Sequence, residues 1–269
     1  ERGYMQGEEE YAEGLDLSSG DDELPKPYDP AKLQVALRSL CFLGDDPYLS
    51  MQVTNVAIVD DFLVQVEAQA AREHIQNDRV PIDQLTFLSA QTQMWLFAIY
   101  ELLRTWRQRV SEALKLHENG GLQFKIDHLR QKDGPADFGS QVRARQLEAV
   151  RDDSDFVEKL RSDQRRVHVI FRTIEALRIS IAKHEVAGIR NSIAFMPGYA
   201  RLDLMTGSLK YELSMGTVIY DYVSRRGIAD GIRAIPDGDA PTAEDIDSYE
   251  EWIKALRTSP PEFPSTEDF

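Results

Sequence analysis

The sequence contains only one cysteine, Cys41, so no disulfide can form within the chain. Its neighbours Leu40 and Phe42 are apolar, which is typical of a thiol that packs in a hydrophobic core. No uninterrupted apolar run approaches the ~20 residues that a membrane-spanning helix needs. The acidic start of the chain also differs from the basic start of a secretory signal. We therefore expect a soluble, cytoplasmic protein without a membrane partner.

Several motifs that bind phosphates or metals are also absent. Gly198, Gly207 and Gly216 precede no lysine–serine or lysine–threonine pair, so the sequence has no P-loop. It has no serine nucleophile elbow and no zinc site built from cysteine pairs. His117 and His128 lack a second histidine at the spacing of a helical metal motif, and we expect both on the surface. The sequence therefore predicts neither a metal nor a cofactor.

Basic residues are fewer than acidic ones, and this imbalance is confined to the ends of the chain. The net charge is -15 at pH 7. Residues 1–29 carry ten acids and two bases, residues 237–251 carry seven acids and no base, and residues 30–236 are nearly neutral. Residues 1–28 also offer little apolar material to offset the entropy of ordering them. We expect flexible acidic termini around a neutral body.

Apolar residues recur at steps of three and four over most of the chain, which predicts a mainly α fold built as a multi-helix bundle. A helix should start after Asp29, and Thr242 with Asp245 forms a capping box for the last one. Asp60 falls within an apolar stripe, a position more typical of a polar residue at the edge of an apolar face, or of one paired with an arginine, than of a functional site. The expected helices between the first and the last cover residues 47–77, 82–117, two short pieces within 122–150, 154–183 and about 217–227.

The helix over residues 82–117 is the longest, and we expect it at the centre of the bundle. Additional apolar residues, Phe87 and Leu96 among them, flank its main stripe and suggest burial on more than one side. Polar and apolar residues alternate around Thr206–Gly207, which predicts a small β-hairpin near 201–213. The predicted division is an acidic flexible arm over 1–29, a helical bundle domain over 30–235, and an acidic linker, C-terminal helix and tail over 236–269.

One side of the predicted helix over 154–183 is rich in arginine. Arg161, Arg165, Arg166 and Arg172 lie away from its apolar seam. Such a face suits phosphates, which leaves RNA possible as a partner, but it is also typical of a solvated face that neutralises an acidic arm.

The two long helices lead to Arg190-Asn191-Ser192-Ile193-Ala194, followed by a turn and the hairpin. This arrangement resembles HEPN-domain proteins, a family of helical bundles common in prokaryotic defence and toxin–antitoxin systems. The resemblance implies a phosphate-binding arginine, a proton-transferring histidine and a homodimer. The family's histidine would fall at Phe195. The resemblance therefore favours a non-catalytic bundle that binds a protein partner or associates with itself.

The remaining candidate site consists of His184, Arg190 and Asn191. In one interpretation His184 is a general base and Arg190 binds an anion. The protein would then be a metal-independent ribonuclease, which is the alternative to the non-catalytic bundle. In the other, His184 ends the apolar seam of the helix, and Arg190 and Asn191 fix the turn into the hairpin. A small-molecule-binding bundle is a third hypothesis, and it requires an enclosed apolar cavity between the long helices.

Overall fold

The computed structural model describes residues 29, 31–77, 82–131, 137–183, 185–186, 200–215 and 218–258. Within these ranges the chain forms eight helices and one three-stranded sheet, which confirms the mainly α fold with a small hairpin. Residues 1–28 of the predicted acidic arm and the C-terminal tail lie outside the described residues, and the proposed domain division stays a prediction.

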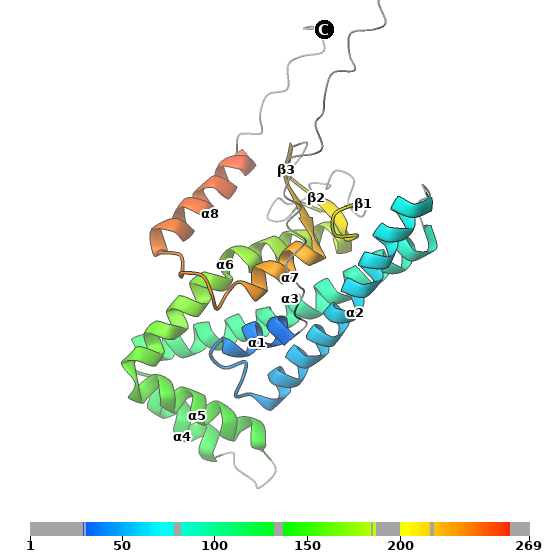
Figure 1. Ribbon diagram of the computed structural model, residues 1–269. Helices are drawn as coiled ribbons and strands as arrows, with labels where there is room; N and C mark the ends of the chain where they lie inside the picture. Colours follow the sequence, from blue (N-terminus) through cyan, green and yellow to red (C-terminus); the bar gives the residue numbers. More distant parts are fainter. Residues whose placement is uncertain are drawn as a thin grey trace, which may run out of the picture.

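The longest helix forms the centre of the bundle, as predicted. In Figure 1, α3 lies between α2 and α6, and α4 and α5 pack together at one end. Helix α8 lies beside α6, whereas α7 contacts α1 as well as α6, and β2 contacts both α3 and α6. In chain order the elements are α1 (Ala31–Ser39), α2 (Pro47–Asn77), α3 (Ile82–Glu118), α4 (Leu122–Gln131), α5 (Phe138–Asp152), α6 (Ser154–Lys183), β1 (Ala200–Leu202), β2 (Leu209–Met215), β3 (Val218–Ser224), α7 (Arg225–Arg233) and α8 (Ala243–Thr258).

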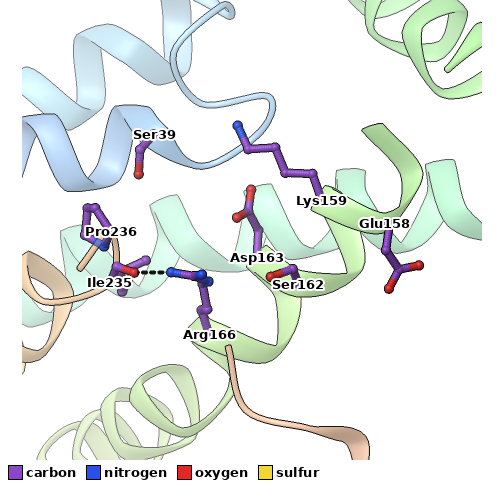
Figure 2. Close-up of a pocket in the computed structure, with 8 residues that line it drawn as sticks. All are labelled: Ser39, Glu158, Lys159, Ser162, Asp163, Arg166, Ile235 and Pro236. Carbon is purple, nitrogen blue, oxygen red and sulfur yellow. Dashed lines mark hydrogen bonds between the residues drawn. The ribbon is translucent and has the colours of Figure 1, made fainter. Parts of the chain in front are cut away.

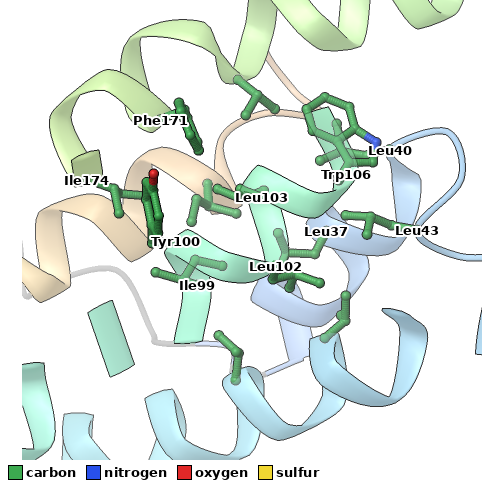
Figure 3. Packing of buried hydrophobic residues seen from close by; sticks show 14 of the residues in the cluster. Leu37, Leu40, Leu43, Ile99, Tyr100, Leu102, Leu103, Trp106, Phe171 and Ile174 are labelled. Atoms are coloured by element: carbon green, nitrogen blue, oxygen red, sulfur yellow. The ribbon is translucent and has the colours of Figure 1, made fainter. Parts of the chain in front are cut away.

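Two tryptophans fix α3 against its neighbours. The indole of Trp95 is buried and donates a hydrogen bond of 3.1 Å to the carbonyl oxygen of Val56 in α2. Trp106 is also buried and donates 2.7 Å to the carbonyl oxygen of Cys41, in the turn after α1. Each side chain combines a large apolar area with a satisfied N–H group. Figure 3 shows Trp106 packed between the end of α1 and the neighbouring leucines.

The turn between α1 and α2 is held by side chains from other helices. The amide of Cys41 donates 2.9 Å to Asp163 of α6, and Gln146 of α5 donates 3.4 Å to the carbonyl oxygen of Phe42. Phe42 has a φ of 72°, a left-handed conformation that costs a residue with a Cβ about 1–2 kcal/mol. Its side chain is buried, and this burial offsets the cost.

The capping box predicted for the last helix is confirmed. The amide of Asp245 donates 3.1 Å to the Thr242 hydroxyl, and the amide of Thr242 donates 2.8 Å to the Asp245 carboxylate. At the other end of the chain, the Asp29 carboxylate accepts 3.0 Å from the amide of Ala31 and caps α1. These local signals placed the starts of both helices correctly.

The helix predicted over about 217–227 is wrong, because residues 218–224 form β3 and α7 starts at Arg225. The segment VIYDYVS is dominated by β-branched and aromatic residues, which favour a strand over a helix. Strand β3 pairs with β2 in an antiparallel register that aligns Val223 with Tyr211. Ser224 then ends the strand and caps α7, since its hydroxyl accepts 3.0 Å from the amide of Gly227.

The predicted hairpin is confirmed, and its turn contacts α2. Gly207 has a φ of +73°, and a Cβ placed on it would lie 1.8 Å from the carbonyl oxygen of Glu67. Both the backbone conformation and the close approach therefore require glycine. This contact fixes where β1 and β2 lie relative to α2.

We expect Gly207→Ala to lower the free energy of unfolding by at least ~2 kcal/mol, since the methyl group adds a backbone clash to left-handed strain. Gly120→Ala is the matched control, because Gly120 has the same φ of +73° but no atom within 4 Å of the added Cβ. It should cost only about 1–2 kcal/mol. Urea denaturation of both variants measures the difference, and equal losses would contradict the close approach.

Candidate functional site

The site predicted from the sequence cannot be placed. His184, Arg190 and Asn191 lie outside the described residues, as does Phe195. Helix α6 ends at Lys183, immediately before the predicted site. The ribonuclease alternative, which depends on His184 and Arg190, therefore stays a prediction.

A fully buried arginine forms a cluster of ion pairs whose acidic side chains are also buried. Arg225, the first residue of α7, donates from Nε and Nη2 to the two carboxylate oxygens of Glu67, at 2.8 and 2.7 Å. Its Nη1 donates to Asp60. Asp60 and Glu67 are seven residues apart on α2, so they lie on the same face two turns apart. The guanidinium thus bridges two buried carboxylates.

Two further arginines complete this cluster. Arg226 lies 3.3 Å from the Glu67 carboxylate, and Arg233 pairs with Asp60. Burial raises the pKa of Glu67, and the neighbouring Arg225 opposes this shift without cancelling it. Because these carboxylates already pair with arginines, the cluster joins α7 to α2 rather than presenting a reactive group. Asp60 is fully buried and paired with arginines, which is one of the two structural roles expected for it.

We expect Arg225→Met to lower the free energy of unfolding by about 3–5 kcal/mol, because the two buried carboxylates lose the arginine that bridges them. Adding Asp60→Asn and Glu67→Gln to this variant should recover part of the loss. Arg104→Met serves as the control, since Arg104 pairs with Glu101 on the exposed side of α3, and it should cost under ~0.5 kcal/mol. Denaturant unfolding measures all three, and equal effects at the two arginines would contradict the role of burial.

A pocket of about 420 Å³ opens between the end of α1, α6 and the chain after α7. Figure 2 shows Lys159, Asp163 and Arg166 of α6 around it, with Ser39 and Pro236 on the opposite walls. Asp163 already accepts a hydrogen bond from the amide of Cys41, and Arg166 donates 2.5 Å to the carbonyl oxygen of Ile235. This pocket is open and is lined mainly by polar and charged residues, and it differs from the enclosed apolar cavity that a small-molecule-binding bundle requires.

The single thiol beside this pocket is held in its neutral form. Burial raises the pKa of Cys41 from its ordinary value of 9.0 to about 12, and the negative charge of Asp163 adds to the shift. The expectation of a core cysteine is confirmed.

We expect the native Cys41 thiol to react with a disulfide reagent at pH 8 roughly a thousandfold more slowly than in denaturant, since each pKa unit lowers the thiolate fraction tenfold. Below pH ~9 the thiol is protonated in both the folded and the unfolded state, so it does not change the free energy of unfolding. Above pH ~9 the unfolded state loses the proton while the folded state retains it, so the free energy of unfolding falls as the pH rises. Absorbance of the released thiol follows the reaction. Rapid labelling of the native chain would contradict burial.

An apolar stripe lies on the exposed side of α2. Tyr48, Met51, Ile58 and Phe62 are between 52% and 64% exposed. Their spacing keeps them on one side of the helix, opposite the stripe that packs in the core. Helix α2 is therefore apolar on two sides, of which only one is covered by the described residues.

A second stripe on α3 continues this surface. Phe87 and Met94 are 42% and 63% exposed. The rings of Phe62 and Phe87 meet edge to face, with centroids 6.4 Å apart, so the two stripes lie side by side. The expected burial of Phe87 is wrong, whereas Leu96 on the same helix is buried as expected. We call this surface the α2–α3 face; it consists of Tyr48, Met51, Ile58, Phe62, Phe87 and Met94.

Charged residues are nearly absent from both helices along the α2–α3 face. Residues 84–100 contain none, and residues 47–66 contain only Asp60, which is buried, and Asp61. Charged residues make up 29% of the whole sequence. Exposed helix faces in globular proteins normally carry charge, and large uncharged apolar patches typically mark interaction sites.

The comparisons with known proteins do not assign this chain to a family. No family model, curated protein or solved structure matches it.

Among the described residues, no helix is long and apolar enough to cross a membrane. The same part of the chain contains no group of three or more histidine, cysteine, aspartate or glutamate side chains that could hold a metal ion. The candidate functional site with the strongest support is the α2–α3 face.

Proposed function

We propose that this protein is a non-catalytic assembly module that associates with a second copy of itself through the α2–α3 face. The proposal rests on the exposed apolar surface of two adjacent helices, which contains few charged residues. The HEPN-like resemblance and a role in prokaryotic defence or toxin–antitoxin systems belong to the same proposal, and they rest on the sequence alone.

The size of the α2–α3 face supports a protein interface. Large side chains bury about 150–250 Å² each, so six that are about half exposed leave roughly 500–800 Å² of mainly apolar surface. The largest apolar patch on a typical monomer is about 300–600 Å², whereas a stable interface buries about 800 Å² on each partner. The face is therefore large for a monomer and close to what a dimer needs.

The chemistry of the α2–α3 face favours a second copy as the occupant. In a homodimer with two-fold symmetry the same patch supplies both sides of the interface. An uncharged apolar patch can meet its own copy without like-charge repulsion, despite the net charge of -15 on the whole chain. A partner with charged residues at its interface would bury them here without countercharges. The antiparallel helices α2 and α3 would then form a four-helix layer with their symmetry mates.

We expect the chain to sediment as a dimer at micromolar concentration. Phe62→Asp and Met94→Asp should each weaken dimerisation at least tenfold, which corresponds to ~1.4 kcal/mol, because each buries a carboxylate without a partner. Phe124→Asp is the control, since Phe124 is 81% exposed but lies on α4. Sedimentation equilibrium measures the association constants. A chain that stays monomeric at about 100 µM, far above a typical specific Kd, would overturn the proposal.

A further inference from the structure

Helix α8 packs outside the main hydrophobic core. Among its described side chains only Ile253 is buried, and it contacts Val186 in a small separate cluster. Tyr249, Leu256 and Tyr220 of β3 pack against this cluster. In Figure 1, α8 lies to one side of the bundle, and α6 is the helix that it contacts most. The apolar attachment of α8 is therefore small compared with that of α2, α3 and α6, which share the main core.

The carboxylate of Glu250 attaches α8 to two side chains of α6, and Tyr249 adds a hydrogen bond to Thr173 of the same helix. Arg172 donates from Nε and Nη2 to the two oxygens of Glu250, at 2.9 and 3.1 Å, and His168 Nε2 donates 2.8 Å to one of them. Burial raises the pKa of Glu250, but the hydrogen bonds from His168 and Arg172 outweigh burial and lower it overall. Two donors four residues apart on one helix thus bind a carboxylate as they would bind that of a ligand.

The charges of the two helices are complementary. Helix α6 has seven bases and four acids, and α8 has five acids and two bases, so their net charges are +3 and -3. Arg107 of α3 adds to the positive side, since it interacts electrostatically with both Glu175 and Glu250. Opposite charge favours the encounter of the two helices, and the bidentate arginine fixes their register.

The chain that leads to α8 has the composition of a linker. Nine residues, 234–242, separate α7 from α8, and they include Pro236, Gly238 and Pro241. Two arginines of α6 hold this segment, since Arg166 donates to the carbonyl oxygen of Ile235 and Arg165 donates 2.9 Å to that of Pro241. A short tether gives the attached helix an effective concentration in the millimolar range. Even a weak intrinsic affinity would therefore keep α8 on α6 within one chain, and a competing helix would need a higher affinity or a higher concentration.

We propose that the face of α6 around His168 and Arg172 is a binding groove for an acidic amphipathic helix, and that α8 occupies it as an exchangeable internal ligand. A partner helix that fits carries a carboxylate for the Arg172–His168 pair, an aromatic residue just before it and an aliphatic residue three positions after it. Tyr249, Glu250 and Ile253 of α8 supply these groups. A nucleic-acid backbone would satisfy the cations but leave the apolar half of the groove uncovered.

The test measures binding of a fluorescein-labelled peptide of residues 243–258 to the full chain by anisotropy. The peptide should bind at least fivefold more tightly to a Glu250→Ala chain than to the unmodified chain, because the internal helix then competes less well. Ile253→Ser, which removes the apolar anchor of α8 and keeps the two donors, should give the same gain. Glu251→Ala is the matched control, since Glu251 is exposed beside Glu250, and it should leave peptide binding unchanged.

Adding Arg172→Glu to the Glu250→Ala chain should abolish the gain in peptide binding. The proposal is overturned if neither Glu250→Ala nor Ile253→Ser tightens peptide binding, or if Glu251→Ala tightens it equally. Tighter binding of a single-stranded RNA oligonucleotide than of the peptide to the Glu250→Ala chain would also overturn it, in favour of a phosphate-binding face. The Phe62→Asp chain should bind the peptide with the same affinity as the unmodified chain. A failure of self-association through the α2–α3 face can therefore be distinguished from a failure of the α6 groove.

Discussion

The contact between Arg225 and the two carboxylates of α2 determines how the sheet is joined to the bundle. Arg225 follows β3 without a linker, so fixing its side chain also fixes the end of the strand. Glu67 contributes twice, since its carboxylate accepts from Arg225 while its backbone carbonyl oxygen faces Gly207 in the β1–β2 turn. A buried ion pair adds little net stability, but it disfavours every arrangement that leaves the charges unpaired. The cluster therefore specifies position more than it adds stability.

The helices could be predicted because local signals and long-range packing agree. Asp29 and the Thr242–Asp245 box mark helix starts by chemistry that acts within four residues. The region around β3 was misread because a short apolar run has no clear period, and its pairing with β2 is not visible in the segment itself. Only the excess of β-branched and aromatic residues over 218–224 indicated a strand.

The candidate sites were harder to predict than the fold. Asp60 and Glu67 stand seven residues apart on an apolar stripe, which indicates a shared buried cation, but Arg225 lies 158 residues after Glu67 and could not be identified. The α2–α3 face was missed for another reason. A helix that is apolar on two sides has apolar residues over most of its circumference. The sequence pattern therefore does not show which of the two sides packs against the rest of the chain. Phe87 was assigned to the core on that basis, and its exposure is known only from the packing.

The glycine in the hairpin turn also limits the alignment of the sheet. Sliding the hairpin along α2 by one residue would bring Thr206 or Ser208 to the point where Gly207 now meets the carbonyl oxygen of Glu67. Either side chain would collide with the helix backbone, and the inward and outward faces of both strands would be exchanged. The hairpin can therefore pack against α2 in only one register. Shifted registers are excluded by steric clash, independently of the ion pairs.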